Sequence, residues 1–122
     1  MKEIMAIIRP SMVNKTKEVL NVLGHPGLTA VSVFGRGKQK SILSEVKDVK
    51  DNLELQEQSR QMTYVPKRLL SITVPDEDVN LIVEAIMKVN HTGNIGDGKI
   101  FVLPVEDSIR VRNKDRGLKA II

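Results

Sequence analysis

Four runs of apolar and β-branched residues have the length and composition of buried strands. Polar segments containing glycine or proline separate them and predict turns. The predicted strands span residues 4–8, 28–34, 65–74 and 100–105. A shorter fifth strand is expected over residues 108–111.

Two further segments carry apolar residues at helical spacing. Between Met12 and Gly24 the apolar positions follow a helical stripe, and Gly24 stands where a glycine commonly ends a helix. Beyond Pro75, a stronger stripe predicts a second amphipathic helix. Its members are Val79, Ile82, Val83, Ile86 and Val89.

The predicted order of elements is β-α-β, long loop, β-α-β, which looks like a duplicated unit. In each half an apolar strand ends at a proline, Pro10 or Pro75, that leads into the helix. The economical arrangement is an α+β split βαβ sandwich, with two helices on one face of an antiparallel four-stranded sheet. We expect one domain over residues 1–122. The other sheet face needs a cover, which favours an oligomer.

Residues 37–63 form a long polar loop between the two halves, and such loops usually have a function. Within it Ile42, Val46, Val49 and Leu53 are spaced 4, 3 and 4 apart, as on one side of a helix. One interpretation is a segment that binds a partner and folds as an amphipathic helix when it docks. A solvated loop with chance spacing has equal weight.

Composition narrows the class of protein. The 122 residues contain no cysteine, which excludes disulfides and thiolate metal sites, and no apolar run is long enough to insert into a membrane. The opening residues lack the form of a signal peptide, so we expect a cytoplasmic protein. The net charge is +4, and basic residues gather in the C-terminal segment 106–122. Aromatic residues for base stacking are scarce, so phosphorylated small molecules suit this charge better than nucleic acid.

The most informative segment is the glycine-rich turn ending at Lys99. Gly93, Gly96 and Gly98 free the backbone for positive φ, and successive N–H groups in such turns form an anion nest. In an extended segment residues i and i+2 share a face, so Arg110 and Arg112 would point to the same side. Together these groups resemble a clamp for a polyphosphate. The alternative is a tight hairpin turn followed by a solvated edge strand.

The chain resembles the PII nitrogen-regulatory signal proteins over essentially its whole length. The shared motifs are Ile7-Ile8-Arg9-Pro10, Gly27-Leu28-Thr29, Gly35-Arg36-Gly37-Lys38-Gln39-Lys40, Pro66-Lys67, Thr92-Gly93-Asn94-Ile95-Gly96-Asp97-Gly98-Lys99-Ile100-Phe101-Val102 and Arg110-Val111-Arg112. The long loop and its base look most like the branch encoded beside nitrogenase genes in archaea and some bacteria.

The resemblance implies a trimer of ferredoxin-like subunits, with ATP or ADP in each cleft between subunits and 2-oxoglutarate beside Mg-ATP. Ile7, Thr29 and Thr73 would surround the adenine and ribose. Gly35, Gly37, Lys38 and Gln39 would contact nucleotide, and Gln39 would ligate Mg²⁺. Gly96, Asp97, Gly98 and Lys99 would cradle the phosphates, with Arg110 and Arg112 reaching them from across the cleft. Lys40 and Lys67 would hold the carboxylates of 2-oxoglutarate.

The chain departs from the usual family pattern at Arg36, Lys38 and Ser41. Lys38 keeps a positive charge but lacks the bidentate fork of an arginine. The loop also has no tyrosine that could be uridylylated, which leaves ligands as the signal.

The resemblance predicts a nitrogen-status sensor that inhibits nitrogenase until 2-oxoglutarate rises. The alternative within the family is a regulator of an ammonium transporter or of another nitrogen-assimilation protein. The subunit could form a homotrimer or a mixed oligomer with a paralogous PII subunit. An enzyme is disfavoured, because there is no phosphate-binding Gly-x-x-x-x-Gly-Lys-Ser/Thr loop and because His25 and His91 are more typical of surface residues than of catalysts. A scaffold without ligands is the other rival.

Overall fold

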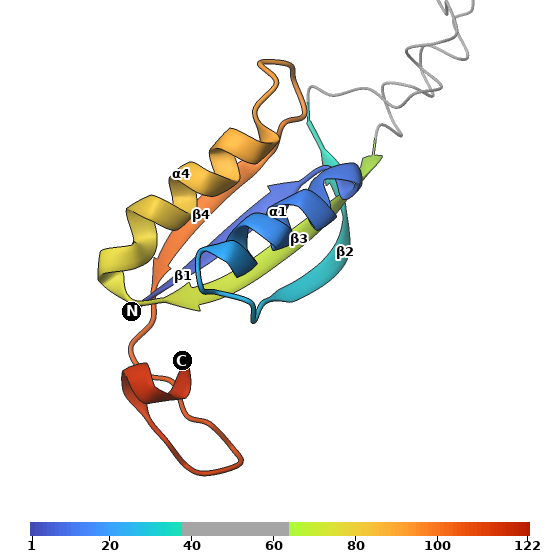
Figure 1. The fold of residues 1–122 in the computed structure, drawn as a ribbon. Helices are drawn as coiled ribbons and strands as arrows, with labels where there is room; N and C mark the ends of the chain where they lie inside the picture. The colour runs from blue at the N-terminus through green and yellow to red at the C-terminus, as the bar shows by residue number, and fades with distance from the viewer. Residues whose placement is uncertain (38–63) are drawn as a thin grey trace, which may run out of the picture.

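A computed structural model describes residues 1–37 and 64–122. In these residues four strands form one antiparallel sheet in the order β2-β3-β1-β4. The strands are β1 (Lys2–Ile8), β2 (Thr29–Arg36), β3 (Tyr64–Val74) and β4 (Lys99–Pro104). Helices α1 (Val13–Val22) and α4 (Val79–Asn90) lie on the same face of the sheet (Figure 1). The predicted ferredoxin-like split βαβ sandwich is confirmed.

The duplication seen in the sequence recurs in the backbone. Each central strand is followed by one extended residue, Arg9 or Pro75, and a short 3₁₀ turn then leads into the helix. These turns span Pro10–Met12 and Asp76–Asp78. A proline at such a position is well placed to start a helix, because its fixed φ suits the first turn.

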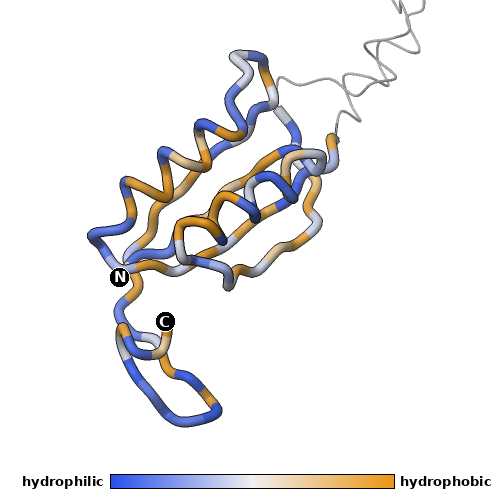
Figure 2. Tube along the Cα trace, in the orientation of Figure 1, coloured by the Kyte–Doolittle hydropathy of each residue, from blue (hydrophilic) through white to orange (hydrophobic). Residues whose placement is uncertain are grey.

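The hydrophobic core lies between the sheet and the two helices. Ile4 and Ala6 of β1 are opposite Ile72 and Leu70 of β3, and alternate residues along both strands point toward the helices. Figure 2 shows these apolar positions as orange stretches along the strands and along the inner sides of the helices. The fully enclosed core residues are Ile4, Ala6, Ile8, Leu20, Leu70, Ile72, Val74, Ile82 and Ile86.

A buried polar pair joins the two helices. The Asn90 Nδ2 donates to Thr16 Oγ1 at 3.1 Å and to the Ile86 carbonyl at 2.9 Å. The Thr16 hydroxyl in turn donates to the Met12 carbonyl at 2.7 Å. This contact fixes the end of α4 against α1, close to the point where the glycine-rich segment begins.

The sheet face opposite the helices is apolar, and within the described residues no element covers it. By register and alternation it includes Met5, Ile7, Val31, Val33, Leu69, Phe101 and Leu103. Val31 is 47% exposed and Phe101 46% exposed. An apolar sheet face of this kind is commonly an association surface, as the sequence pattern indicated.

The predicted fifth strand over residues 108–111 is wrong. In this segment Ile109 makes only an isolated bridge to Arg116, and the chain turns back on itself. The Arg110 N–H donates to the Asp115 carbonyl, and the Lys114 N–H donates to the Arg110 carbonyl, both at 2.8 Å. These local hydrogen bonds satisfy the backbone without a sheet partner.

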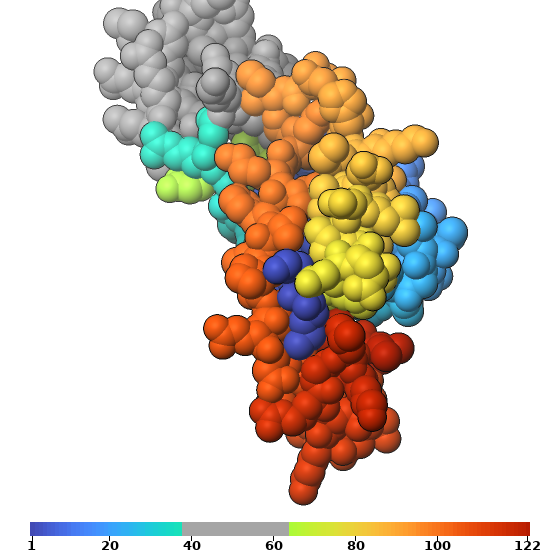
Figure 3. All heavy atoms as spheres, turned by 90° about the vertical axis from the view of Figure 1, so that its left-hand side faces the viewer, coloured from blue at the N-terminus to red at the C-terminus, as the bar shows by residue number. Residues whose placement is uncertain are grey.

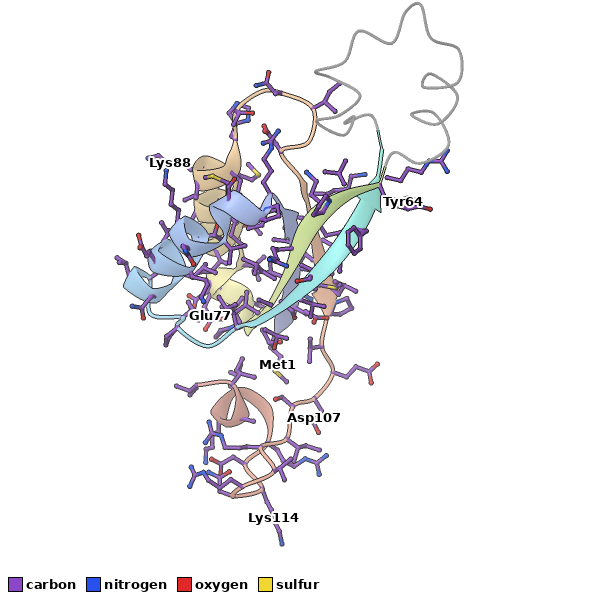
Figure 4. The ribbon with its side chains drawn as sticks, turned by 90° about the vertical axis from the view of Figure 1, so that its right-hand side faces the viewer. Met1, Tyr64, Glu77, Lys88, Asp107 and Lys114 are labelled. Carbon is purple, nitrogen blue, oxygen red and sulfur yellow. The ribbon has the colours of Figure 1, made fainter. Side chains whose placement is uncertain are left out.

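The C-terminal segment therefore forms a separate hairpin-like loop that ends in a 3₁₀ turn over Gly117–Ala120. It extends beyond the end of the sheet near Met1, where Figure 4 labels Asp107 and Lys114. In the described parts of the chain, no helix has the length and apolar character needed to cross a membrane.

Candidate functional site

The glycine-rich turn between α4 and β4 has the backbone that the sequence predicted. Gly93, Gly96 and Gly98 have φ of +88°, +103° and +118°. At Gly98 a Cβ atom would lie 2.0 Å from the Ile7 carbonyl oxygen, so the turn presses directly against the end of β1. Only glycine allows both this backbone conformation and this close approach.

The Asp97 carboxylate holds the turn together from inside. Its Oδ2 accepts the N–H groups of Thr92 and Gly93, at 2.7 and 2.9 Å. Its Oδ1 accepts the Thr92 hydroxyl and the Arg9 guanidinium, the latter at 2.6 Å. Hydrogen bonds from Thr92 and then from Arg9 hold the pKa of Asp97 well below its usual range. Asp97 thus shapes the turn as a permanent anion, as expected of a turn residue between two glycines, and not as a base.

Two cations, one in β3 and one just after β1, also hold the turn. Arg9 also donates to the Ile95 carbonyl at 3.1 Å. The Lys67 ammonium donates to the Gly96 carbonyl at 2.6 Å, although Lys67 belongs to β3 and is buried. Burial lowers the pKa of Lys67, the positive charge of Arg9 lowers it further, and Asp97 opposes both effects.

Other predicted residues lie at this same end of the sheet. Lys99 begins β4 opposite Ile7 and is exposed. Gly35 lies near the end of β2, where an added Cβ would be 3.6 Å from Lys67 Cγ, an ordinary contact. Gly37 is exposed at the limit of the described chain. In Figure 1 the α4–β4 turn and the end of β2 occupy the same end of the molecule. We call this group the turn cluster: Ile7, Gly35, Gly37, Lys67, Gly96, Asp97, Gly98 and Lys99.

A groove of about 860 Å³ leads away from the turn cluster between α4 and β4. Its walls are mostly apolar and include Val83, Met87 and Val102, while Asp97 and Lys99 are at its end near the turn. Figure 3 shows this face, with α4 beside β4 and the C-terminal segment at the far end of the molecule.

The remaining predicted residues lie at the opposite end of the sheet. Thr29 begins β2, opposite Ser71, and Thr73 is opposite Glu3 near the start of β1. Arg110 and Arg112 follow in the C-terminal segment beyond the end of β4. We call Thr29, Thr73, Arg110 and Arg112 the far cluster. The path along β3 from Lys67 to Thr73 is about 20 Å at the usual rise per strand residue. One chain therefore does not bring the two clusters together.

The two arginines do not share a strand face as predicted, because the chain turns at Val111–Asn113. The Arg110 guanidinium contacts its own C-terminal segment. It lies 3.3 Å from Asp115 Oδ2 and donates to the carbonyls of Lys119 and Ile122, at 3.0 and 2.9 Å. Arg112 is exposed. Arg110 would have to exchange some of these contacts to hold a phosphate.

Lys38, Gln39 and Lys40 lie outside the described residues, as does the stripe from Ile42 to Leu53. The role of Arg9 was not predicted from the sequence, where Arg9 was noted only within the shared motif Ile7-Ile8-Arg9-Pro10. Nor was the role of Thr92, which contacts Asp97 through both its N–H and its hydroxyl. The position of Thr92 immediately before the first glycine was the available signal, since threonine commonly hydrogen-bonds within turns.

Comparison with known proteins gives consistent results. The family model described as "Nitrogen regulatory protein P-II" matches residues 1–115. A Methanobacterium ivanovii protein named "Nitrogen fixation nifHD region GlnB-like protein 2" is 58% identical over 122 residues, covering 100% of both chains. A Methanococcus maripaludis protein of the same name is 58% identical over 121 residues, covering 99% of this chain and 100% of the relative.

A solved structure shares the fold as well. The crystal structure of Arabidopsis thaliana PII bound to citrate matches with a TM-score of 0.74 and 32% identity. The match covers 98% of this chain and 88% of that one.

These findings define the chain first as a ferredoxin-like regulatory protein. It belongs to the P-II nitrogen regulatory protein family, and its relatives match the nitrogen-fixation-associated branch that the motifs indicated.

Proposed function

We propose that this protein senses nitrogen status by binding ATP or ADP at sites shared between neighbouring subunits. The observation that carries the proposal is the glycine-rich turn, whose three glycines at positive φ lie beside Lys99 and the buried Lys67. Backbone amides of this kind and nearby cations suit a polyphosphate. The exposed Lys99 supplies a mobile positive charge, and Asp97 keeps the turn in shape from within.

The separation of the two clusters supports a shared site. If the far cluster of one subunit meets the turn cluster of the next, Thr29, Arg110 and Arg112 complete a site that one chain leaves unfinished. Contact between opposite ends of identical subunits is head-to-tail, and such contacts form a ring when the rotation from one subunit to the next closes. The uncovered apolar sheet face gives the ring an interior to bury. Three subunits are the number that the family resemblance implies.

The second ligand of the proposed sensor is 2-oxoglutarate, bound beside Mg-ATP at the base of the long loop. Lys40 and Lys67 hold its carboxylates, and Gln39 supplies an amide oxygen to Mg²⁺, a hard cation that prefers oxygen ligands. When bound there, Mg²⁺ would supply neutralisation of phosphate charge. Differential affinity of these ligands for two loop arrangements is sufficient for switching.

The proposed output is the partner-binding loop, residues 37–63. Relatives are named for a nitrogen fixation region, and this supports nitrogenase as the target. The protein inhibits nitrogenase when 2-oxoglutarate is low and releases it when 2-oxoglutarate rises. Cytoplasmic location and regulation without catalysis belong to the same proposal, and a paralogous subunit could join the oligomer.

Calorimetric titration tests the sensor directly. Mg-ATP is titrated first, followed by 2-oxoglutarate with and without the nucleotide. We expect nucleotide binding, and 2-oxoglutarate binding that depends on Mg-ATP. Absence of nucleotide binding to the assembled oligomer would contradict the proposal and favour a scaffold. Nucleotide binding without any effect of 2-oxoglutarate would restrict the protein to sensing adenylates.

Deletion of residues 42–54 tests the output. The shortened protein should bind Mg-ATP normally, since the turn and far clusters are intact, but should no longer inhibit nitrogenase in a reconstituted assay. Inhibition by the shortened protein would show that the loop is not the output.

A further inference from the structure

Lys67 stands out because its buried ammonium contacts a backbone carbonyl of the glycine turn. It is 8% exposed and lies on the sheet face away from the helices, opposite Val33 of β2. From there the side chain reaches the Gly96 carbonyl at 2.6 Å, a residue 29 positions further along the chain. A short hydrogen bond from a charged donor is among the stronger contacts in a protein.

This contact determines which way the turn presents its amides. In a trans peptide the C=O and the following N–H point in opposite directions. By holding the Gly96 carbonyl toward the sheet, Lys67 turns the Asp97 N–H to the other side. Arg9 meanwhile holds the Asp97 carboxylate at 2.6 Å. The peptide N–H and the side chain of Asp97 are thus each oriented by a cation, Lys67 of β3 for the peptide and Arg9 for the carboxylate.

An ammonium has three donors, so Lys67 can hold the Gly96 carbonyl and a ligand carboxylate at the same time. Its surroundings favour such a ligand. Burial and the neighbouring Arg9 lower the pKa of Lys67, and a carboxylate beside it would stabilise the charged form. A bound effector would therefore strengthen the ammonium's hold on the turn.

We propose that Lys67 is a positioning residue that orients the phosphate turn through the Gly96 carbonyl and so links the effector site to the nucleotide site. The inference rests on the proposed function, in which Lys67 only receives a carboxylate of the effector. It adds that Lys67 acts on nucleotide binding when no effector is present. Linkage then requires that each ligand raise the affinity for the other by the same factor.

The test uses the full-length oligomer without 2-oxoglutarate and compares the wild type with Lys67→Met, Lys67→Arg and Arg68→Met. Arg68 is the matched control, since it is the neighbouring cation on β3 and donates instead to Ser32. Affinity for Mg-ATP is measured by calorimetry. Hydrogen–deuterium exchange of a peptide covering residues 92–98 is measured in the ligand-free proteins.

We expect Lys67→Met to bind Mg-ATP about tenfold more weakly, the size of effect expected when one hydrogen bond from a charged donor is lost. We also expect faster exchange in the 92–98 peptide, partial recovery of both properties in Lys67→Arg, and no change in Arg68→Met. A melting temperature close to that of the wild type would show that the fold is retained.

Unchanged Mg-ATP affinity in a folded Lys67→Met would overturn the inference. Weaker affinity with unchanged exchange would also overturn it, because that pattern indicates loss of charge and not loss of positioning. Failure of the wild type to bind Mg-ATP would instead contradict the proposed function, so the two failures are distinguishable.

Discussion

Substitution of Gly98 by alanine should expose how tightly the glycine turn is packed on the sheet. The added Cβ would lie 2.0 Å from the Ile7 carbonyl oxygen and 3.3 Å from Ile8 Cα. Both are backbone atoms of the central strand β1, which cannot move without disturbing its pairing with β3 and β4. The turn itself must therefore shift away from the sheet.

The size of the effect follows from two contributions. Alanine at φ of +118° is strained, which costs about 1–3 kcal/mol. The shift of the turn that removes the backbone clash costs about 1–3 kcal/mol more, as in other overpacked sites. We expect Gly98→Ala to lower the free energy of unfolding by about 3 kcal/mol. It should also remove Mg-ATP binding, because the amides no longer face the ligand together.

Gly93→Ala is the matched control, because Gly93 has φ of +88° but nothing lies within 4 Å of an added Cβ. It should lose only about 1 kcal/mol, the cost of the backbone conformation alone. Urea unfolding of both variants at one protein concentration gives the comparison. Equal losses for the two variants would refute the steric argument at Gly98.

Three further substitutions test the core, the turn and the open sheet face. Ile82→Ala removes a fully buried side chain and should cost about 2–5 kcal/mol in urea unfolding, and a loss below 1 kcal/mol would contradict the packing. The pKa of Asp97 is lowered in the folded protein, so its carboxylate stabilises the fold above about pH 4 and this contribution is lost as the pH falls below that value. The melting temperature should therefore fall less on acidification in Asp97→Asn than in the wild type. Parallel curves of melting temperature against pH for the two proteins would contradict this. Phe101→Asp should dissociate the oligomer, as measured by analytical ultracentrifugation. Leu81→Asp, on the exposed side of α4, should leave the oligomer intact. An intact Phe101→Asp oligomer would show that the open sheet face is not the interface.

Much of the fold could be predicted because the periodicities are strong and local. Alternation at Leu70, Ile72 and Val74, and the helical stripe from Val79 to Val89, reflect which side chains face the core. The positive φ of the three turn glycines could also be predicted from the residue type. Register and strand order could not, since they depend on contacts between distant segments.

The wrong prediction of a fifth strand has a local cause. A run of only four residues carries a weak strand signal, and the chain around Arg110 satisfies its polar groups nearby. Lys114 adopts φ of +63°, and Asp115 accepts the Asn113 amide at 3.0 Å. Turn chemistry of this kind overrides a short β-branched pattern.

The candidate site was only partly accessible from the sequence. The residue types at the turn indicate an anion site, but the partners of Asp97 do not follow from spacing, because Arg9 lies 88 positions away. The distance of Thr29, Arg110 and Arg112 from the turn could not be predicted either, because it depends on the sheet topology.

Subunit complementation measures whether the nucleotide site is shared between neighbouring subunits. Lys99→Met damages the turn cluster, and the double variant Arg110→Met/Arg112→Met damages the far cluster, so each oligomer alone should bind Mg-ATP weakly. After unfolding and refolding together in equal amounts, about a quarter of the junctions in a head-to-tail ring join two undamaged clusters. If the site is shared, tight Mg-ATP binding should return at about that fraction of sites. If refolded mixtures bind Mg-ATP no better than the separate variants, the site is not shared between subunits.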